Sequence, residues 1–110
     1  MKTSSAKSKG RSLQKWVRDI LLSLNPTLTK DDVRSTAMGQ SGVDIQLSSA
    51  AKLFIPYSIE CKNLARIAVY SLYDQAKQNS GELTPILVIK QNRSEPLVVV
   101  DAKWFFENNK

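Results

Sequence analysis

Histidine is absent from this 110-residue sequence, and cysteine occurs once, as Cys61. Zinc sites built on histidines or several cysteines therefore lack their ligands, and catalytic triads that need a histidine base lack that base. A single cysteine also excludes a disulfide within the chain. Apolar runs fall far short of the roughly 20 residues of a membrane-spanning helix, and the N-terminus lacks the apolar core of a secretory signal. We expect an intracellular, cytoplasmic protein with no membrane partner.

Acidic residues are few relative to basic ones. Ten Asp and Glu stand against 16 Lys and Arg, which gives a net charge of +6 and points to a polyanionic partner. With 42% hydrophobic and 24% charged residues, the chain has the composition of a globular protein of one domain. We place that domain at residues 11–110.

Basic residues are concentrated at the N-terminus, before the first acid at Asp19. Residues 1–10 are rich in serine, lysine and glycine and have too little apolar surface to fold, so we predict a flexible basic arm. Two interpretations of this arm remain open, a phosphate-binding segment and a solubilising tail. The binding interpretation assigns DNA contacts to Lys7, Lys9, Arg11 and Lys15.

Hydrophobic periodicity predicts a helix over residues 11–24, where apolar residues recur at a spacing of three and four. These residues are Leu13, Trp16, Val17, Ile20, Leu21 and Leu24. Thr29 and Asp32 resemble a capping box that opens a short helical turn, and residues 38–42 are predicted to form a loop.

Two segments alternate between apolar and polar residues, the period of a half-buried strand. The first covers residues 43–48 and the second residues 57–62, with residues 52–56 as the connection. In the second strand Ile59 and Cys61 share one face. The opposite face carries Ser58, Glu60 and Lys62.

The remainder of the chain continues the mixed pattern. A helix is predicted over residues 65–79, with Gly81 as its stop. Residues 85–90 and 97–100 are apolar enough for two further strands, and a short helix surrounds residues 104–106. This order predicts an α/β fold in which a mixed β-sheet of about four strands is flanked by helices.

The polar faces of the two alternating strands carry the candidate chemistry. Glu60 and Lys62 stand two residues apart on one strand, so both side chains point to the same side. If the strands pair as a hairpin, Asp44 lies near Glu60, and two carboxylates converge where a hard cation can bind. Mg²⁺ or Mn²⁺ held by Asp44, Glu60 and the main-chain carbonyl of Cys61 would suit this set. Lys62 would then act on a water or on the attacked phosphate.

At these residues the sequence resembles the PD-(D/E)xK nuclease superfamily, and within it the small phage and archaeal-type Holliday-junction resolvases. The resemblance extends from Arg11 to Phe106 through the segments GRSLQKWVR, DVRS, SGVDI, SIECKN, QA and NRS. It implies a restriction-endonuclease-like core in which Asp44, Glu60 and Lys62 occupy the motif positions. It also assigns Gln75 to the helix glutamine that supports the site; the other interpretation is a glutamine that satisfies backbone groups.

Two positions depart from the family pattern. Val43 stands where a proline often precedes the motif aspartate, and the acid often found in the first helix is missing, with Gln14 the nearest candidate. The second departure leaves the number of metal ions open.

The resemblance implies an endonuclease that cuts DNA to leave a 5′-phosphate, with a branched substrate such as the four-way junction. It would act in the cytoplasm, inside the host cell if it is phage-encoded. Alternatives are a nicking or sequence-directed endonuclease of the same fold and a non-catalytic DNA-binding module. Arg34, Lys90 and Arg93 are further DNA-contact candidates, although each is equally consistent with solvated surface charge.

Cutting two opposing strands of a junction needs two sites, so we expect a symmetric homodimer. The apolar residues 97–100 and the aromatic residues 104–106 are candidates for its interface, with plain core as the alternative. For Trp16, Trp104, Phe105 and Phe106, spacing favours core positions over stacking platforms for bases.

Overall fold

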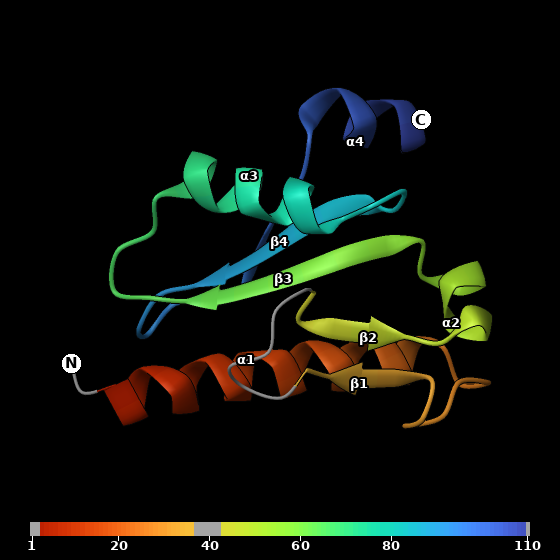
Figure 1. Ribbon diagram of the computed structural model, residues 1–110, viewed down its shortest axis with the longest axis horizontal. Helices are drawn as coiled ribbons and strands as arrows, with labels where there is room; N and C mark the ends of the chain where they lie inside the picture. Colours follow the sequence, from red (N-terminus) through yellow and green to blue (C-terminus); the bar gives the residue numbers. More distant parts are fainter. Residues whose placement is uncertain (1–2, 37–42, 110) are drawn as a thin grey trace.

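In the computed structural model, which describes residues 3–36 and 43–109, four helices and five strands follow one another along the chain (Figure 1). Their order is α1 (Thr3–Leu24), β1 (Val33–Ser35), β2 (Ile45–Leu47), α2 (Ser49–Phe54), β3 (Tyr57–Asn63), α3 (Val69–Asn79), β4 (Thr84–Lys90), β5 (Leu97–Val99) and α4 (Ala102–Asn108). The α/β class is confirmed.

The strands of the described residues form two small sheets instead of one sheet of about four. β1 and β2 pair antiparallel, while β3, β4 and β5 form a mixed sheet in that order. β3 and β4 are parallel, so they need the crossover that α3 supplies. The two sheets pack against each other through the core, and beside β3 the Asp44 N–H donates to the Ile59 carbonyl at 3.2 Å.

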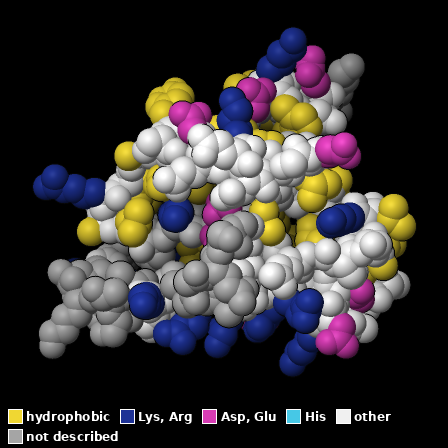
Figure 2. All heavy atoms as spheres, in the orientation of Figure 1, with side chains coloured by type: hydrophobic (Ala, Val, Ile, Leu, Met, Phe, Trp, Pro, Cys, Tyr) yellow, Lys and Arg dark blue, Asp and Glu magenta, His cyan; other side chains and the backbone are white. Residues whose placement is uncertain are grey.

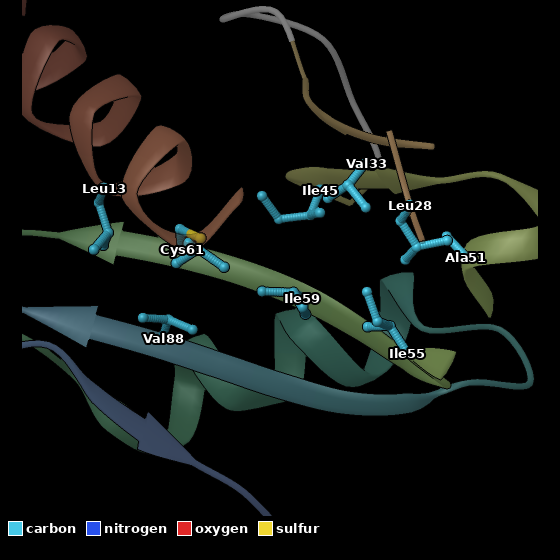
Figure 3. Packing of buried hydrophobic residues seen from close by; sticks show 10 residues of the cluster. Leu13, Leu28, Val33, Ile45, Ala51, Ile55, Ile59, Cys61 and Val88 are labelled. Carbon is cyan, nitrogen blue, oxygen red and sulfur yellow. The ribbon is translucent and has the colours of Figure 1, made fainter. Parts of the chain in front are cut away.

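Helices α1 and α3 lie on opposite sides of the β3–β4 pair (Figure 1). The apolar face of α1 is buried through Leu13 and Val17, and this cluster includes Ile59, Cys61 and Val88 of the sheet (Figure 3). On the other side, α3 buries Ala76. Strand β3, at one edge of the three-stranded sheet, is therefore covered on both faces.

Because helices cover both faces of β3, its alternating pattern does not separate a buried face from a solvent-exposed one. As predicted, Ile59 and Cys61 belong to the apolar cluster. The opposite face is not solvent-facing, however, because Ser58 and Glu60 are only 2% and 5% exposed. A carboxyl group thus lies inside the fold.

The segment after α1 is a turn followed by a strand, where a short helical turn was expected. The N–H and the hydroxyl of Thr29 both donate to Asp32 Oδ2, at 2.9 and 3.1 Å. Asp32 Oδ1 accepts from the Ser48 hydroxyl at 2.7 Å, which ties the turn to the far end of β2. The capping-box bond predicted for Thr29 and Asp32 therefore forms, but the turn does not extend into a helix, because Val33 is fully buried and begins β1.

The connection before β3 contains a helix that the sequence interpretation missed. The Ser48 hydroxyl caps α2 by accepting from the Ala51 N–H at 3.0 Å. Ala51 and Ile55 are buried, so this short helix closes one end of the core.

Helix α3 begins at Val69 and not at residue 65. Its predicted stop is confirmed, because Gly81 has a φ of 57°, in the left-handed region that glycine adopts without cost.

Residues 3–10 belong to helix α1, although a flexible arm was predicted there. Long-range contacts explain the difference: Lys9 Nζ donates to Asn92 Oδ1 at 2.8 Å, and Asn63 Nδ2 donates to the Lys9 carbonyl at 3.5 Å. The predicted loop at residues 38–42 lies outside the described residues.

Three of the four aromatic residues predicted as core have large exposed fractions: 47% for Trp16, 44% for Phe105 and 71% for Phe106. Trp104 is half-buried and meets Tyr57 edge-to-face, with ring centroids 5.9 Å apart. Along the described chain, no helix combines the length and apolarity that crossing a membrane requires.

Candidate functional site

Asp44 is held beside β3 by two backbone interactions. It precedes β2, and its N–H donates to the Ile59 carbonyl. Its side-chain Oδ2 accepts from the Cys61 N–H at 2.7 Å. Donor and acceptor flank Glu60 in the sequence, so the backbone of β3 fixes the Asp44 carboxylate next to that residue.

Glu60 is the buried member of the carboxylate pair. Its Oε1 accepts a hydrogen bond from Asn79 Nδ2 of α3 at 2.9 Å. The pKa of Glu60 is raised from 4.5 to about 7, chiefly because burial disfavours the charged form and also because Asp44 is a neighbouring negative charge. The hydrogen bond from Asn79 and the charge of Lys62 act in the opposite direction.

Lys62 follows on the same face of β3 and is half-buried. The structure therefore brings together the three residues Asp44, Glu60 and Lys62, which the sequence interpretation selected from two separate segments. The result is a buried acid, a second carboxylate and a cation within one small region.

The supporting amide differs from the predicted one. Gln75 is exposed on α3, whereas Asn79, one helical turn further on, reaches Glu60. Both residues lie on the same stripe of the helix. Which of the two residues contacts β3 depends on how α3 packs against the sheet. The helical spacing therefore predicted the face of α3 that meets Glu60, but not that Asn79 is the residue in contact.

Asn79→Ala should raise the pKa of Glu60 above about 7. The hydrogen bond from Asn79 stabilises the charged carboxylate in the wild type, and the variant lacks this bond. Gln75→Ala should leave that pKa unchanged, and it serves as the matched control. A ¹³C NMR titration of the Glu60 carboxyl in metal-free protein measures both variants. Equal shifts in the two variants would contradict the assignment of Asn79.

The cysteine side chain is not a ligand candidate. The thiol of Cys61 belongs to the core cluster on the α1 side of β3, and burial raises its pKa. Within the described ranges, no group of three or more His, Cys, Asp or Glu side chains gathers in one place. Asp44 and Glu60 are thus the side-chain anions of this site.

A divalent cation fits this carboxylate pair. A buried carboxyl beside a second carboxylate is costly to ionise, as the raised pKa of Glu60 records, and a bound cation offsets that cost. Oxygen donors of this kind suit Mg²⁺, which keeps several of its waters and needs few protein ligands.

Gln14, the nearest candidate for the missing acid of the first helix, is buried at 5% exposure. Its Oε1 has no hydrogen-bond partner among the described residues. The orphaned oxygen is an unused acceptor inside the fold.

The predicted DNA-contact residues fall into two groups. Lys7, Arg11 and Lys15 are exposed at four-residue spacing along α1, and we call them the α1 basic stripe. Figure 2 shows Lys and Arg side chains gathered along the α1 edge of the molecule. Arg34 is exposed on β1, the strand that contacts α1. The second group, Lys9, Lys90 and Arg93, lines a hollow between α1 and the β4–β5 turn.

The α1 basic stripe is unfavourable for the helix itself. Like charges at four-residue spacing repel one another. A bound polyanion would relieve that cost.

No family model, curated protein or solved structure matches this chain. The site combines a carboxylate pair, a neighbouring lysine and a basic surface.

Proposed function

We propose that this protein is a metal-dependent endonuclease that hydrolyses DNA phosphodiesters at Asp44, Glu60 and Lys62. The observation that carries the proposal is the meeting of Asp44 with Glu60. The Cys61 N–H holds one carboxylate while the other is buried with a pKa of about 7. A structural surface pair has no need of such a costly burial, whereas perturbed carboxyl groups are characteristic of functional sites.

In this proposal Asp44 and Glu60, with the main-chain carbonyl of Cys61, hold Mg²⁺ or Mn²⁺. When bound, the cation supplies a Lewis acid and lowers the pKa of a coordinated water. Lys62 places a positive charge on the same side of β3, where it stabilises the charge that develops on the attacked phosphate. Hydrolysis would form a bond between a water oxygen and phosphorus and break the bond from phosphorus to O3′, which leaves a 5′-phosphate and a 3′-hydroxyl.

The fold supports the same proposal. A mixed sheet covered by α1 and α3, with the motif aspartate entering from the neighbouring β2, suits the restriction-endonuclease-like core that the family resemblance implies. A branched substrate such as the four-way junction is the family's expectation. The α1 basic stripe supports DNA as the polymer.

Replacing Arg11 and Lys15 together by glutamine should weaken binding to every DNA tested. Each lost phosphate contact removes about one unit from the slope of log affinity against log salt, so the slope should shrink by about two. Fluorescence anisotropy across a salt series measures it. Lys77→Gln with Lys103→Gln removes the same charge from exposed positions on α3 and α4. An equal decrease in the salt slope for this control would show that the α1 basic stripe has no specific role in DNA binding.

The proposed working form is a homodimer, with a second copy of the chain on the outer edge of the β3–β4–β5 sheet. β5 is the terminal strand of that sheet, and its Leu97 and Val98 are 62% and 59% exposed. An apolar hollow of about 270 Å³, lined in part by Ile20 and Ile86, adjoins it. Exposed apolar edges invite pairing with another chain.

Val98→Glu should therefore convert a two-chain particle to a single chain in light scattering. Leu53→Glu is the matched control, because Leu53 is 83% exposed on α2, away from the β5 edge. A wild-type mass of one chain, even with junction DNA bound, would exclude the dimer and favour a nickase.

One cleavage assay tests the function itself. Labelled four-way junction, linear duplex and single strand are incubated with the protein, with and without Mg²⁺. Mg²⁺-dependent cutting of the junction on opposing strands supports the resolvase, and cutting of one strand of duplex supports the nickase. Binding with no cutting under any condition would leave a DNA-binding module.

A further inference from the structure

A second candidate site lies on the other face of β3 from Glu60. It is a hollow of about 550 Å³ between the first half of α1 and the turn that joins β4 to β5. Both elements lie at the end of the sheet where β3 and β4 finish (Figure 1). This volume is in the range of small-ligand pockets.

The walls of the hollow carry mainly positive charge. Lys9, Lys90 and Arg93 line it, against the single carboxylate of Glu95. The bond from Lys9 Nζ to Asn92 Oδ1 anchors α1 to the turn and so defines the shape of the hollow. Three cations facing one anion favour a phosphate as the occupant.

An aromatic surface adjoins these charges. Trp16 lines the hollow and is 47% exposed, and it also borders the apolar hollow beside β5. Tryptophan beside lysine and arginine is the combination that holds single-stranded nucleic acid, with bases stacked on the ring and phosphates paired with the cations.

Two local costs at the hollow also point to a ligand. Asn63 lines it, and its Oδ1 is buried with no hydrogen-bond partner in the described part of the chain. Such an orphaned acceptor is a free-energy cost that folded proteins seldom leave without a compensating role. Arg93 has a φ of 63°, a left-handed conformation that is unfavourable for a residue with a side chain and is found preferentially at binding sites.

We propose that this hollow binds one unpaired nucleotide of the DNA substrate, with its base on Trp16 and a phosphate on Lys90 and Arg93. The proposal rests on the proposed function in taking DNA as the polymer. In a duplex both faces of a base are covered by its neighbours, so only an unpaired base can stack on the indole. Asn63 directly follows Lys62 in β3, so the hollow and the lysine of the candidate cleavage site lie at adjacent residues of this strand, on its opposite faces.

A site for one unpaired nucleotide favours a particular class of DNA substrate. DNA with an unpaired nucleotide near the cut, as in a flap, a splayed end or an open junction, gains a contact that continuous duplex lacks. Such substrates should bind more tightly than a duplex of the same length.

The test uses the full chain with Trp104→Phe, so that Trp16 is the one remaining tryptophan. A short oligothymidine and a closed dumbbell duplex, which has no free ends, are titrated in without metal at constant protein concentration. Oligothymidine should quench Trp16 emission, because stacking perturbs the indole, and the dumbbell should not. Equal quenching by both, or none by oligothymidine, would overturn the proposal.

Affinity variants give a second readout, measured with labelled DNA. Trp16→Leu keeps an apolar side chain but no ring, and it should weaken oligothymidine binding about tenfold or more while leaving the dumbbell unchanged. Trp16→Phe should restore part of the loss. Equal weakening for both DNAs would assign Trp16 a structural role and sink the proposal.

Cleavage of the four-way junction by the Trp104→Phe protein separates the two proposals. Cleavage without quenching of Trp16 would support the nuclease proposal and contradict the nucleotide site. Selective quenching without any cutting in Mg²⁺ would retain the nucleotide site and remove the nuclease.

Discussion

Asp44→Asn and Glu60→Gln should each reduce Mg²⁺-dependent cleavage of junction DNA on the order of 100-fold or more, while DNA binding persists. Each substitution removes one carboxylate charge from the proposed metal site and leaves the α1 basic stripe intact. Single-turnover cleavage rates and anisotropy on the same DNA measure the two properties separately.

The matched control for this loss is Glu82→Gln, which makes the same chemical change at an exposed position after α3. It should cut at the wild-type rate. Lys62→Ala should lose turnover yet still bind Mg²⁺ in calorimetry, because Lys62 is assigned to the phosphate and not to the metal. Wild-type cleavage by Asp44→Asn or Glu60→Gln at saturating Mg²⁺ would show that the site is wrong.

The same Glu60→Gln variant should be more stable than the wild type at pH 8 in the absence of metal, by about 2 to 3 kcal/mol. The folded pKa of Glu60 is about 7, above its ordinary 4.5, so the folded protein favours the protonated carboxyl. The contribution of the protonated Glu60 to the free energy of unfolding has its full value below pH 4.5 and is lost as the pH rises through 7. Glutamine cannot ionise, so the variant avoids that loss.

Urea unfolding in chelator at pH 4 and pH 8 measures this difference, again with Glu82→Gln as the reference. The advantage of Glu60→Gln should be present at pH 8 and vanish at pH 4. Added Mg²⁺ should stabilise the wild type at pH 8 but not Glu60→Gln, because only the ionised carboxylate binds the cation. A gap between the variants that is equal at both pH values would refute the raised pKa of Glu60.

Loss of cleavage together with gain of stability would distinguish a functional carboxylate from a structural one. Replacing a glutamate that serves packing or an ion pair makes the folded protein less stable. A glutamate retained for chemistry raises the free energy of the metal-free fold, and its removal relieves that cost.

The sequence by itself determined the elements that depend on neighbouring residues. The apolar face of α1 around Leu13 and Val17, the alternation through β3 and the glycine stop at Gly81 were all predictable. Each is a short-range pattern in which chain geometry alone decides which side chains share a face. The candidate set Asp44, Glu60 and Lys62 was also visible there, because two alternating strands carried it.

The tertiary structure determined the burial and the contacts of these residues. β1 begins directly after the turn at Thr29–Asp32 because Val33 is buried, and residues 3–10 are helical where Lys9 meets Asn92, 83 positions away. Asn79 replaced Gln75 beside Glu60 because the packing of α3 on β3 selects one turn of a helix that local pattern cannot distinguish from the next. The raised pKa of Glu60 and the hollow beside Trp16 arise in the same way, since burial and cavity shape depend on which distant elements pack together.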